Sequence, residues 1–425
     1  MQGSGGRALT FAGPIHGANY MRLVIIGAGF AGMYAALSAA RLRDIQGVLP
    51  EELEIALVAP EPTLVIRPRL YEPEPETLTA PLLDVLNAID VNYVQGSAET
   101  VDTRSRVVQI AMGKGTRKTL SYHRLVVATG SRLFRPTIPG LADHGFSVDS
   151  LDDAVALDKH LHGLAKRPAV NGRDTVVVAG GGFTGIEAAT EMPARLRKIL
   201  GNRAKPRVII VERNPAIAPD MGDTSRPIIE NALKKLCVET RLGACVASLD
   251  ETGVTLVNGE HIETETVIWA AGIRAAPLTQ QIPSERDNFG RLLVDRDLRV
   301  PAVPGVFATG DAARAACDGN GNYALMSCQH ATRMGAFAGN NAAAELLGVR
   351  TRPYHQEGYV TCLDLGEAGA LFTTGWDRKV AMVDDIAKKT KQEINRVWIY
   401  PPKAERAAAL ASADPEHVTD VTGFL

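Results

Sequence analysis

The sequence predicts an α/β fold with two similar parallel-sheet units and a small C-terminal module. Three observations lead to this prediction. The chain has 425 residues, enough for two or three domains that each bury a core. The stretches LVIIGAGFAGMY (residues 23–34) and VVVAGGGFTGIE (residues 176–187) repeat one pattern. In both, an apolar strand leads into a glycine-rich turn and then into a helix, as parallel α/β units do.

Both turns have the G-x-G-x-x-G spacing of a dinucleotide-binding loop. The strands cover residues 22–26 and 175–179, and the helices run from about Phe30 to Arg43 and from about Thr184 to Leu200. The first glycine permits a tight turn, the second lets backbone approach a pyrophosphate, and the third lets helix pack on strand. One such loop can be an ordinary tight turn, whereas two copies predict two Rossmann-like domains and two dinucleotides. The residues expected to line them are Gly27, Ala28, Gly29, Phe30, Ala31, Gly32, Gly180, Gly182, Phe183, Thr184 and Gly185.

The end of the next strand distinguishes the two copies. The residues 32 positions after Gly27 and Gly180 are Ala59 and Glu212. An acidic residue at this place accepts hydrogen bonds from ribose hydroxyls, so Glu212 favours NADH, and Arg213 would offset part of its repulsion of an NADPH phosphate. The alternative for Glu212 is a solvated strand end. In the first copy the nearest acid is Glu61, which is the candidate for the ribose contact.

Three further apolar strands end in turns of small residues, in RLVVATGS (from residue 124), TVIWAAGI (from 266) and VFATGDAA (from 306). An Asp after the third strand can accept hydrogen bonds from the ribityl chain of a flavin, and the following helix N-terminus would face the pyrimidine side of the ring. The simpler alternative is a helix N-cap. The residues expected at a cofactor in these turns are Ala128, Thr129, Gly130, Ala271, Gly272, Gly310 and Asp311.

Composition excludes several other classes of protein. The formal net charge is −2 and no basic block occurs, which argues against a nucleic-acid partner. The five cysteines form no CxxC pair, so we expect reduced thiols in a cytoplasmic protein, with no metal site and no redox-active dithiol. No apolar run reaches the length of about 18 residues that spans a bilayer. Residues 1–20 lack signal-peptide character, and we expect an extension or leader outside the fold.

These motifs together resemble the two-dinucleotide-binding-domain flavoproteins, and most of all the type II NADH dehydrogenases, which are single-chain NADH:quinone oxidoreductases. The matching segments are GAGFAG, ATGSR, GGGFTGIE, VIWAAGIRA, GVFATGDAA and ATRMGAFAGNNAAAELLG, from residue 21 to about 347. The resemblance implies a glutathione-reductase-like arrangement with FAD on the first loop, NADH on the second and hydride transfer between stacked rings. It also implies that Asp311 holds the ribityl chain, that Glu187 lies near NADH and that Arg67 belongs to a segment over the flavin.

The chain departs from this family at three places. Ala59 replaces the flavin-ribose acid, and the C-terminal stretch is mostly polar where the family often has a membrane anchor. The quinone-site pattern A-Q-x-A-x-Q reads CQHATR here, which keeps Gln329 and puts Arg333 in place of the second glutamine. His330 could pass a proton to a quinone, since its ordinary pKa is roughly 6.5, and Arg333 could stabilise an anionic acceptor. The alternative is that His330 bonds a carbonyl and Arg333 pairs with an acid.

The predicted domains are 21–150 with 290–345 for FAD, 151–289 for NAD, and 346–425 as a C-terminal module at an interface or a membrane surface. Residues 107–122 predict a small antiparallel insertion, and residues 358–374 predict short strands. Basic residues precede the apolar and aromatic block 397–400 within 388–403, a combination that suits an anionic membrane surface. The alternative there is a packed strand with a solvated charged face.

The sequence therefore predicts an enzyme that transfers hydride from NADH to FAD and then electrons to a quinone or a similar small acceptor such as oxygen. No side-chain nucleophile is needed, because the cofactors carry the chemistry. Two alternatives stay open. One is a ferredoxin or rubredoxin reductase, which needs a basic docking face, and the other is an NADH-sensing flavoprotein with little turnover. A homodimer and a peripheral contact with the cytoplasmic membrane are further expectations.

Overall fold

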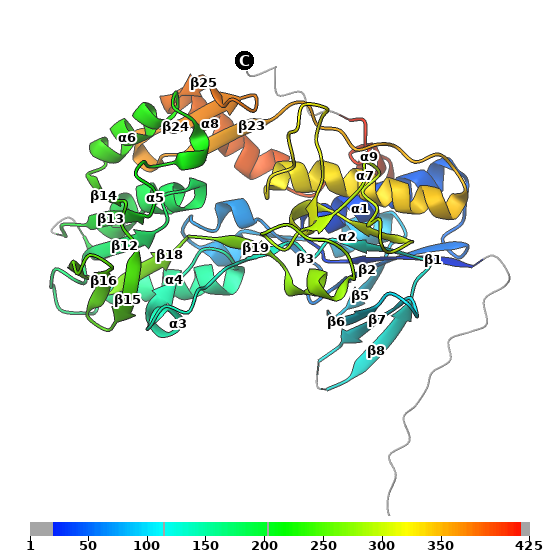
Figure 1. Cartoon of the computed structure of the whole chain (residues 1–425), viewed down its shortest axis with the longest axis horizontal. Coiled ribbons are helices and arrows are strands. Elements are labelled where there is room, and N and C mark those ends of the chain that lie inside the picture. The colour runs from blue at the N-terminus through cyan, green and yellow to red at the C-terminus, as the bar shows by residue number, and fades with distance from the viewer. Residues whose placement is uncertain (1–19, 114, 202–203, 418–425) are drawn as a thin grey trace, which may run out of the picture.

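The structure, a computed structural model, describes residues 20–113, 115–201 and 204–417. Two five-stranded parallel sheets lie side by side across the molecule, and the C-terminal strands lie above the second sheet in the view of Figure 1. This arrangement confirms the predicted α/β fold with Rossmann-like sheets. Apart from Tyr20, the extension expected over residues 1–20 falls outside the described residues.

The first sheet is completed by a strand from far along the chain. Its order is β21–β9–β1–β2–β5, all parallel, with buried apolar strands as expected for a sheet covered on both faces. β21 follows the whole second sheet in sequence, so this unit is assembled from two separate stretches of chain. The strands are β1 (Met21–Ile26), β2 (Leu53–Ala59), β5 (Asn92–Gln95), β9 (Arg124–Val127) and β21 (Val306–Ala308).

Helices α1 (Phe30–Ile45) and α7 (Cys328–Leu347) cross at very close range beside this sheet (Figure 1). A Cβ atom added to Gly335 would lie 2.3 Å from the Ala31 carbonyl oxygen, and one added to Gly339 would meet backbone equally tightly. Only glycine permits this approach. The contact holds the N-terminus of α7 beside the first glycine loop, from which α1 begins.

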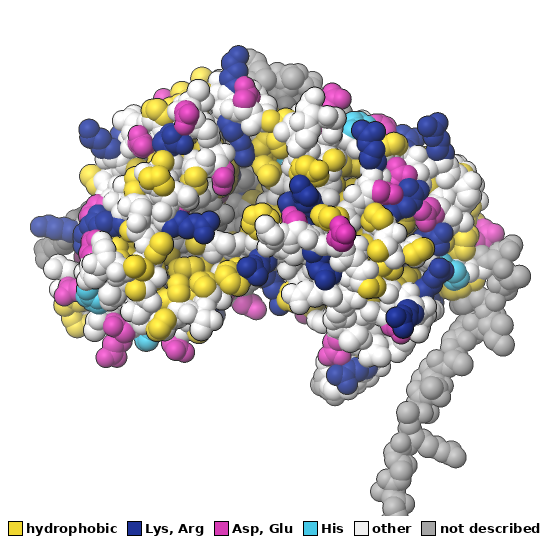
Figure 2. All heavy atoms as spheres, viewed as in Figure 1, with side chains coloured by type: hydrophobic (Ala, Val, Ile, Leu, Met, Phe, Trp, Pro, Cys, Tyr) yellow, Lys and Arg dark blue, Asp and Glu magenta, His cyan; other side chains and the backbone are white. Residues whose placement is uncertain are grey.

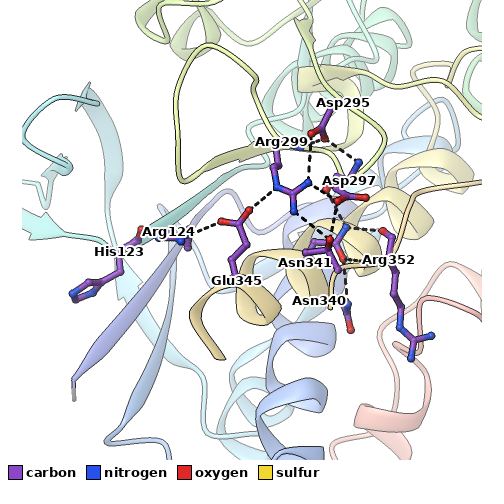
Figure 3. Close-up of polar contacts among 10 residues, drawn as sticks. His123, Arg124, Asp295, Asp297, Arg299, Asn340, Asn341, Glu345 and Arg352 are labelled. Carbon is purple, nitrogen blue, oxygen red and sulfur yellow. Dashed lines mark hydrogen bonds and ion pairs between the residues drawn. The ribbon is translucent and has the colours of Figure 1, made fainter. Parts of the chain in front are cut away.

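A network of ion pairs fixes the other end of α7, as Figure 3 shows. The Glu345 carboxylate accepts from Arg299 Nε and from Arg124 Nε, each at 2.5 Å, and Arg124 lies on β9. Asn341 donates to the Arg352 carbonyl at 2.8 Å. Because α7 is held at both ends, its first turn has a defined position relative to the sheet.

The second sheet is built from the chain between β9 and β21. Its order is β11–β18–β12–β13–β14, all parallel, and an antiparallel ribbon of β10 and β19 links the two sheets. The elements are β10 (Ser131–Leu133), β11 (Gly145–Phe146), α4 (Leu151–Leu164), β12 (Thr175–Ala179), α5 (Phe183–Leu200), β13 (Arg207–Glu212), α6 (Arg226–Lys235), β14 (Val238–Leu242), β18 (Thr266–Trp269) and β19 (Ile273–Ala275).

Both small antiparallel sheets expected from the sequence are present. One consists of β6 (Ser97–Asp102), β7 (Val107–Ala111) and β8 (Arg117–Ser121), and it projects below the first sheet in Figure 1. The other consists of the C-terminal strands β23 (Val360–Asp364), β24 (Ala370–Thr374) and β25 (Lys379–Val383). The remaining elements are β3 (Thr63–Val65), β4 (Thr79–Pro81), α2 (Leu83–Ala88), α3 (Leu141–His144), β15 (Val246–Asp250), β16 (Gly253–Leu256), β17 (His261–Glu263), β20 (Leu292–Leu293), β22 (Ala313–Arg314) and α9 (Arg406–Ala411).

The alternative of a packed strand within residues 388–403 is wrong. The chain forms helix α8 (Asp384–Glu393), which continues into a π-helical turn, Ile394–Trp398. Ala387, Thr390 and Lys391 are buried at helical spacing, Lys388 is half-buried against Asp364, and Lys389 is exposed. This spacing of buried residues is that of a helix. Across the described ranges, no helix combines the length and apolar character needed to cross a bilayer.

Candidate functional site

The two glycine loops have nearly the same backbone. Gly27 has φ +110° and Gly180 has φ +118°, a region that L side chains rarely adopt. A Cβ on Gly32 would lie 1.7 Å from the Gly27 oxygen, and one on Gly185 would lie 1.9 Å from the Gly180 oxygen. The first and third glycines are therefore required by the protein's own packing.

The middle glycines face open space instead. Gly29 and Gly182 are the N-caps of α1 and α5, and neither helix start has a side-chain cap. Apart from the adjoining residues of the chain, no atom of the described residues lies within 4 Å of the point where a Cβ on either glycine would sit. The first N–H groups of both helices are thus free to meet an anion, which fits the pyrophosphate of a dinucleotide. The other predicted loop residues lie within the loops or the first turns of these helices.

The turns after the neighbouring strands lie against these loops, at the carboxyl edges of the sheets. A Cβ on Gly27 would be 2.3 Å from the Ala128 oxygen, and one on Gly180 would be 3.1 Å from the Ala271 Cβ. Gly310 packs against the first turn of α1. The motifs singled out in the sequence are therefore brought together where open α/β sheets bind their ligands.

Asp311 lies in a polar group beside the first loop. Its Oδ2 accepts from the Ser131 hydroxyl at 2.5 Å and lies 3.7 Å from an Arg67 guanidinium nitrogen, while burial raises the pKa of its carboxyl. The hydroxyls of Thr129 and Thr309 are buried and have no hydrogen-bond partner among the described residues. Buried hydroxyls without partners are rare, and a carboxylate beside them suits a polyhydroxyl chain. These residues fit the ribityl portion of a flavin.

Glu212 is buried at the end of β13, with 5% of its surface exposed. Its Oε2 accepts from the Gly181 N–H at 2.7 Å, and its Oε1 accepts from the backbone and side-chain nitrogens of Asn214 at 2.8 and 2.5 Å. It is therefore bonded to the glycine loop, and the alternative of a solvated strand end is wrong. Arg213 is exposed.

The corresponding position of the first sheet is organised differently. The Ala59 carbonyl accepts from the Tyr93 hydroxyl at 2.8 Å. Glu61 is exposed, and its charge adds to the effect of burial that raises the pKa of Tyr93 to about 12. No carboxylate stands at the strand end itself, so Glu61 remains the candidate for a ribose contact.

Glu187 forms a buried ion pair that the sequence did not reveal. Its Oε1 lies 2.8 Å from Lys391 Nζ, and both side chains are about 95% buried. The Asp364 N–H donates to the same oxygen at 3.0 Å, and Lys391 also donates to the Cys362 carbonyl at 3.0 Å. Burial raises the pKa of Glu187 to about 7 against the opposing effect of Lys391, whose own pKa is raised by the carboxylate. The Glu187 carboxyl can therefore gain or lose a proton near neutral pH.

Further ionisable groups surround this pair. Lys388 bonds the Asp364 carboxylate at 2.5 Å, and the Tyr71 hydroxyl donates to the same carboxylate at 3.2 Å. Burial raises the pKa of Glu191, one helical turn after Glu187 on α5, to about 7. Two carboxyl groups that titrate near neutrality thus lie on one face of α5. Such clusters mark functional sites more often than chance.

His330 lies in the first turn of α7 and is fully buried. The Ser327 hydroxyl lies 2.9 Å from its Nδ1, so its partner is a hydroxyl and the alternative of a bond to a carbonyl is wrong. Burial lowers the pKa of His330 to about 3, and the ring is neutral at pH 7. Its Nε2 and the Nε1 of Trp376 are buried without partners among the described residues, with ring centroids 5.7 Å apart.

Arg333 and Gln329 bind the backbone of the C-terminal segment. Arg333 donates to the carbonyls of His355 and His417 at 2.8 and 3.1 Å. Its Nη2 also lies 3.2 Å from His355 Nε2, and no acid pairs with it among the described residues, so the alternative of pairing with an acid is wrong. Gln329 Oε1 accepts from the Val360 N–H at 3.5 Å. His330 and Arg333 have separate partners, so the structure does not join them in one network.

Residues 21–335 match the family of pyridine nucleotide-disulphide oxidoreductases. The chain belongs to this family. It is 45% identical over 397 residues to an NADH dehydrogenase-like protein of Mycobacterium tuberculosis, covering 93% of this chain and 98% of that protein. A type II NADH:quinone oxidoreductase of Staphylococcus saprophyticus is 25% identical over 362 residues, 81% of this chain and 87% of the relative.

A solved structure of NDH2 from Plasmodium falciparum in complex with NADH has the same fold, with a TM-score of 0.74 at 14% identity, covering 92% of this chain and 97% of that one. The family assignment and these relatives make the protein an oxidoreductase similar to NADH dehydrogenases, of a family that binds a flavin and NAD(H). They agree with the two glycine loops and with the resemblance drawn from the motifs.

Proposed function

We propose that this protein is an FAD-dependent NADH dehydrogenase that passes electrons to a quinone. The observation that carries the proposal is the buried Glu187–Lys391 pair beside the second glycine loop. Lys391 Nζ lies 5.7 Å from the centroid of the Phe183 ring in this loop. Burial raises the pKa of the Cys328 thiol at the start of α7, and the positive charge of Lys391 opposes this rise. A proton-holding pair is what quinone reduction requires and what simple electron transfer does not.

We assign FAD to the first glycine loop and NADH to the second from the residues around each loop. Gly29 and the start of α1 would hold the FAD pyrophosphate, and Asp311 with Thr129 and Thr309 would hold its ribityl chain. When bound, the flavin supplies the two-electron chemistry between NADH and the acceptor. Gly182 and the second loop would hold NADH, leaving the protein to orient the ligands and exclude water.

The proton consumed in quinone reduction suggests a role for the buried Glu187–Lys391 pair. Converting NADH and a quinone to NAD⁺ and a quinol consumes one proton beyond the hydride. Glu187 would carry that proton, since its pKa is about 7, and Lys391 would stabilise the carboxylate left behind. His330 stays neutral at working pH, so its part would be to donate a hydrogen bond from Nε2–H to an acceptor oxygen, together with Trp376 Nε1–H.

A lipid-borne quinone also fits the outer surface of the C-terminal module. On α8 and the following turn, Ile386 is 66% exposed and Val397 is 56% exposed, and Lys389 and Arg396 are exposed beside them. Apolar side chains with cations around them suit an anionic membrane surface. The module would then place the acceptor region next to the lipid in which the quinone dissolves.

The acceptor assignment is tested by following reoxidation of the flavin. Holoenzyme reduced anaerobically with one equivalent of NADH is mixed with a short-chain quinone or with aerated buffer. We expect quinone to reoxidise the flavin at least about tenfold faster than oxygen, and Glu187→Gln to slow the quinone reaction while leaving reduction by NADH intact. Reoxidation by neither acceptor would overturn the quinone assignment and favour a sensing role.

A second candidate acceptor, an acidic electron-carrier protein, is favoured by one surface. Arg132 and Arg274 face each other across the β10–β19 ribbon, are exposed, and form no ion pair within the described part of the chain. Arg274 instead lies over the ring of Phe134, 4.1 Å from its centroid. Like charges directly opposite destabilise a ribbon, and an acidic partner would relieve this. In Figure 2, Lys and Arg side chains lie on both sides of the hollow between the two halves.

This second candidate predicts electron transfer to a small acidic iron–sulfur protein at a rate that falls with ionic strength. The double variant Arg132→Glu with Arg274→Glu should transfer electrons to the iron–sulfur protein more slowly and without this dependence on ionic strength. Its rate of quinone reduction should be unchanged. If wild type and the double variant reduced the iron–sulfur protein at the same rate, this candidate would be eliminated.

A further inference from the structure

The second glycine loop is connected to the end of β13 through a single carboxylate. Glu212 receives three hydrogen bonds, all from neutral N–H groups: one from Gly181 in the loop and two from Asn214. No cation pairs with Glu212 among the described residues. The carboxylate is therefore oriented by its donors while its negative charge remains uncompensated at the place where the ribose of a dinucleotide binds.

Asn214 supplies most of this orientation. Its amide nitrogen donates to Oε1 at 2.5 Å and its backbone nitrogen at 2.8 Å, so Oε1 is saturated and Oε2 keeps a lone pair beyond the bond from Gly181. Asn214 is itself braced, because its carbonyl accepts from the Gly243 N–H at 2.9 Å. The Ala244 N–H donates to the Glu212 carbonyl at 3.0 Å, which fixes the same strand end from the other side.

Arg213 stands between these two residues in sequence but is not part of their network. Its side chain is exposed and forms no ion pair within the described ranges, although Glu212 is adjacent in sequence. A free guanidinium at this strand end is suited to a phosphate, because it offers a planar fork of donors. This strand end therefore carries a carboxylate that suits the ribose hydroxyls of NADH and a guanidinium that suits the 2′-phosphate of NADPH.

We infer that Asn214 determines the preference for NADH over NADPH by holding Glu212 in the ribose position, and that Arg213 recognises a 2′-phosphate only when this hold is lost. Asn214 is thus a positioning residue. The inference rests on the proposed function only in assigning NADH to the second loop. With Asn214 in place, a 2′-phosphate would meet the fixed carboxylate at close range; without its amide, Glu212 can rotate away and leave Arg213 as the nearest charge.

The test is calorimetric binding of NAD⁺ and NADP⁺ to the holoenzyme, which needs no turnover. The proteins are wild type, Asn214→Ala, Arg213→Ala and the double variant. We expect Asn214→Ala to weaken NAD⁺ binding and to lower the ratio of the NADP⁺ and NAD⁺ dissociation constants by about tenfold. In the double variant NADP⁺ should bind as weakly as in wild type, while Arg213→Ala alone should change the ratio little.

An unchanged ratio in Asn214→Ala would overturn the inference, and so would a lowered ratio that persists in the double variant. Asn214→Ser, which keeps a short hydrogen-bonding side chain and the backbone donor, should give an intermediate ratio. Flavin absorbance and the melting temperature of each variant show whether the fold is intact. If wild-type protein binds neither nucleotide, the assignment of the second loop fails instead, which distinguishes the two proposals.

Discussion

The two glycine loops differ little in backbone and greatly in what surrounds them. Gly27 and Gly180 have φ values of +110° and +118°, and both loops open onto an uncapped helix start. At the next strand end, however, one copy has Ala59, whose carbonyl binds Tyr93, and the other has Glu212 fixed to its own loop. In the function proposed, the loop geometry would recognise the pyrophosphate that all dinucleotides share, and the neighbouring residues would decide which dinucleotide binds.

The two sites also differ in the state of their polar groups. After the strands of the first sheet, Thr129 and Thr309 have buried hydroxyls without partners among the described residues, beside the Asp311 carboxylate. Near the second loop, Glu212 is bonded to the loop itself, and Glu187 is paired with Lys391. Unpartnered buried hydroxyls suit a cofactor that stays bound, because its leaving would expose them to no other partner.

The largest expected effects come from matched substitutions of the middle glycines. The added methyl of Gly29→Ala or Gly182→Ala would meet no atom within 4 Å among the described residues beyond its neighbours in the chain, so both variants should fold normally. Each methyl would displace a pyrophosphate from at least two N–H donors, worth about 3–6 kcal/mol, or more than about 100-fold in affinity. We expect Gly29→Ala to lose flavin absorbance and Gly182→Ala to keep it while losing NADH binding.

The measurements are the 450 nm absorbance of the purified proteins and calorimetry with NAD⁺. Loss of flavin from both variants, or from neither, would mean that the loops are not divided between the two ligands.

The next effect concerns Lys391, which lies close to the second loop. Lys391→Met leaves Glu187 buried without its partner, and we expect the free energy of unfolding at pH 8 to fall by about 3–5 kcal/mol. Urea unfolding at pH 8 measures it, and Lys389→Met, on the exposed face of the same helix, is the matched control. A loss as small as that of the control would contradict the role of the pair.

The pH dependence of stability follows from the same residue. The pKa of Glu187 is raised from 4.5 to about 7 in the folded protein, so its stabilising contribution is full below pH 4.5 and is lost as the pH rises through 7. Relative to Glu187→Gln, the wild type should lose about 3 kcal/mol across this window. Parallel stability curves for the two proteins between pH 4.5 and 8 would show that Glu187 does not titrate as described.

The smallest expected effect concerns the start of α7, which a side chain caps, in contrast to the starts of α1 and α5. The Ser327 hydroxyl accepts from the His330 N–H at the start of α7, whereas α1 and α5 begin without a side-chain cap. Ser327→Ala should cost about 1 kcal/mol of stability, measured by chemical unfolding, and should leave flavin content unchanged. A loss of flavin in this variant would mean that the α7 start belongs to the first site more directly.

Much of the fold could be predicted from the sequence because its signals are local. Each glycine loop combines a strand, a turn and a helix within about a dozen residues, and the observed α1 and α5 begin at Phe30 and Phe183, within one residue of the predicted starts. The antiparallel strands around residues 107–122 were predicted for the same reason. Such patterns need no knowledge of distant parts of the chain.

The interactions that the sequence concealed are long-range. Glu187 and Lys391 are 204 positions apart, and nothing near Lys391 distinguishes it from its exposed neighbours except a helical burial period that begins at Ala387. The same holds for Arg333, whose partners are two backbone carbonyls and the His355 ring, all at least 22 positions away in the sequence. The helix at residues 384–393 was missed because nearby aromatic and β-branched residues favour a strand.

The division of the two loops is tested most directly by anaerobic stopped-flow absorbance of the holoenzyme mixed with NADH and, separately, with NADPH. We predict rapid bleaching near 450 nm by NADH and bleaching at least about tenfold slower by NADPH at equal concentration, because in the function proposed Glu212 would face the ribose of the bound nucleotide. Equal rates with both nucleotides would contradict the role given to Glu212. No bleaching by either would contradict the assignment of one loop to the flavin and the other to its electron donor.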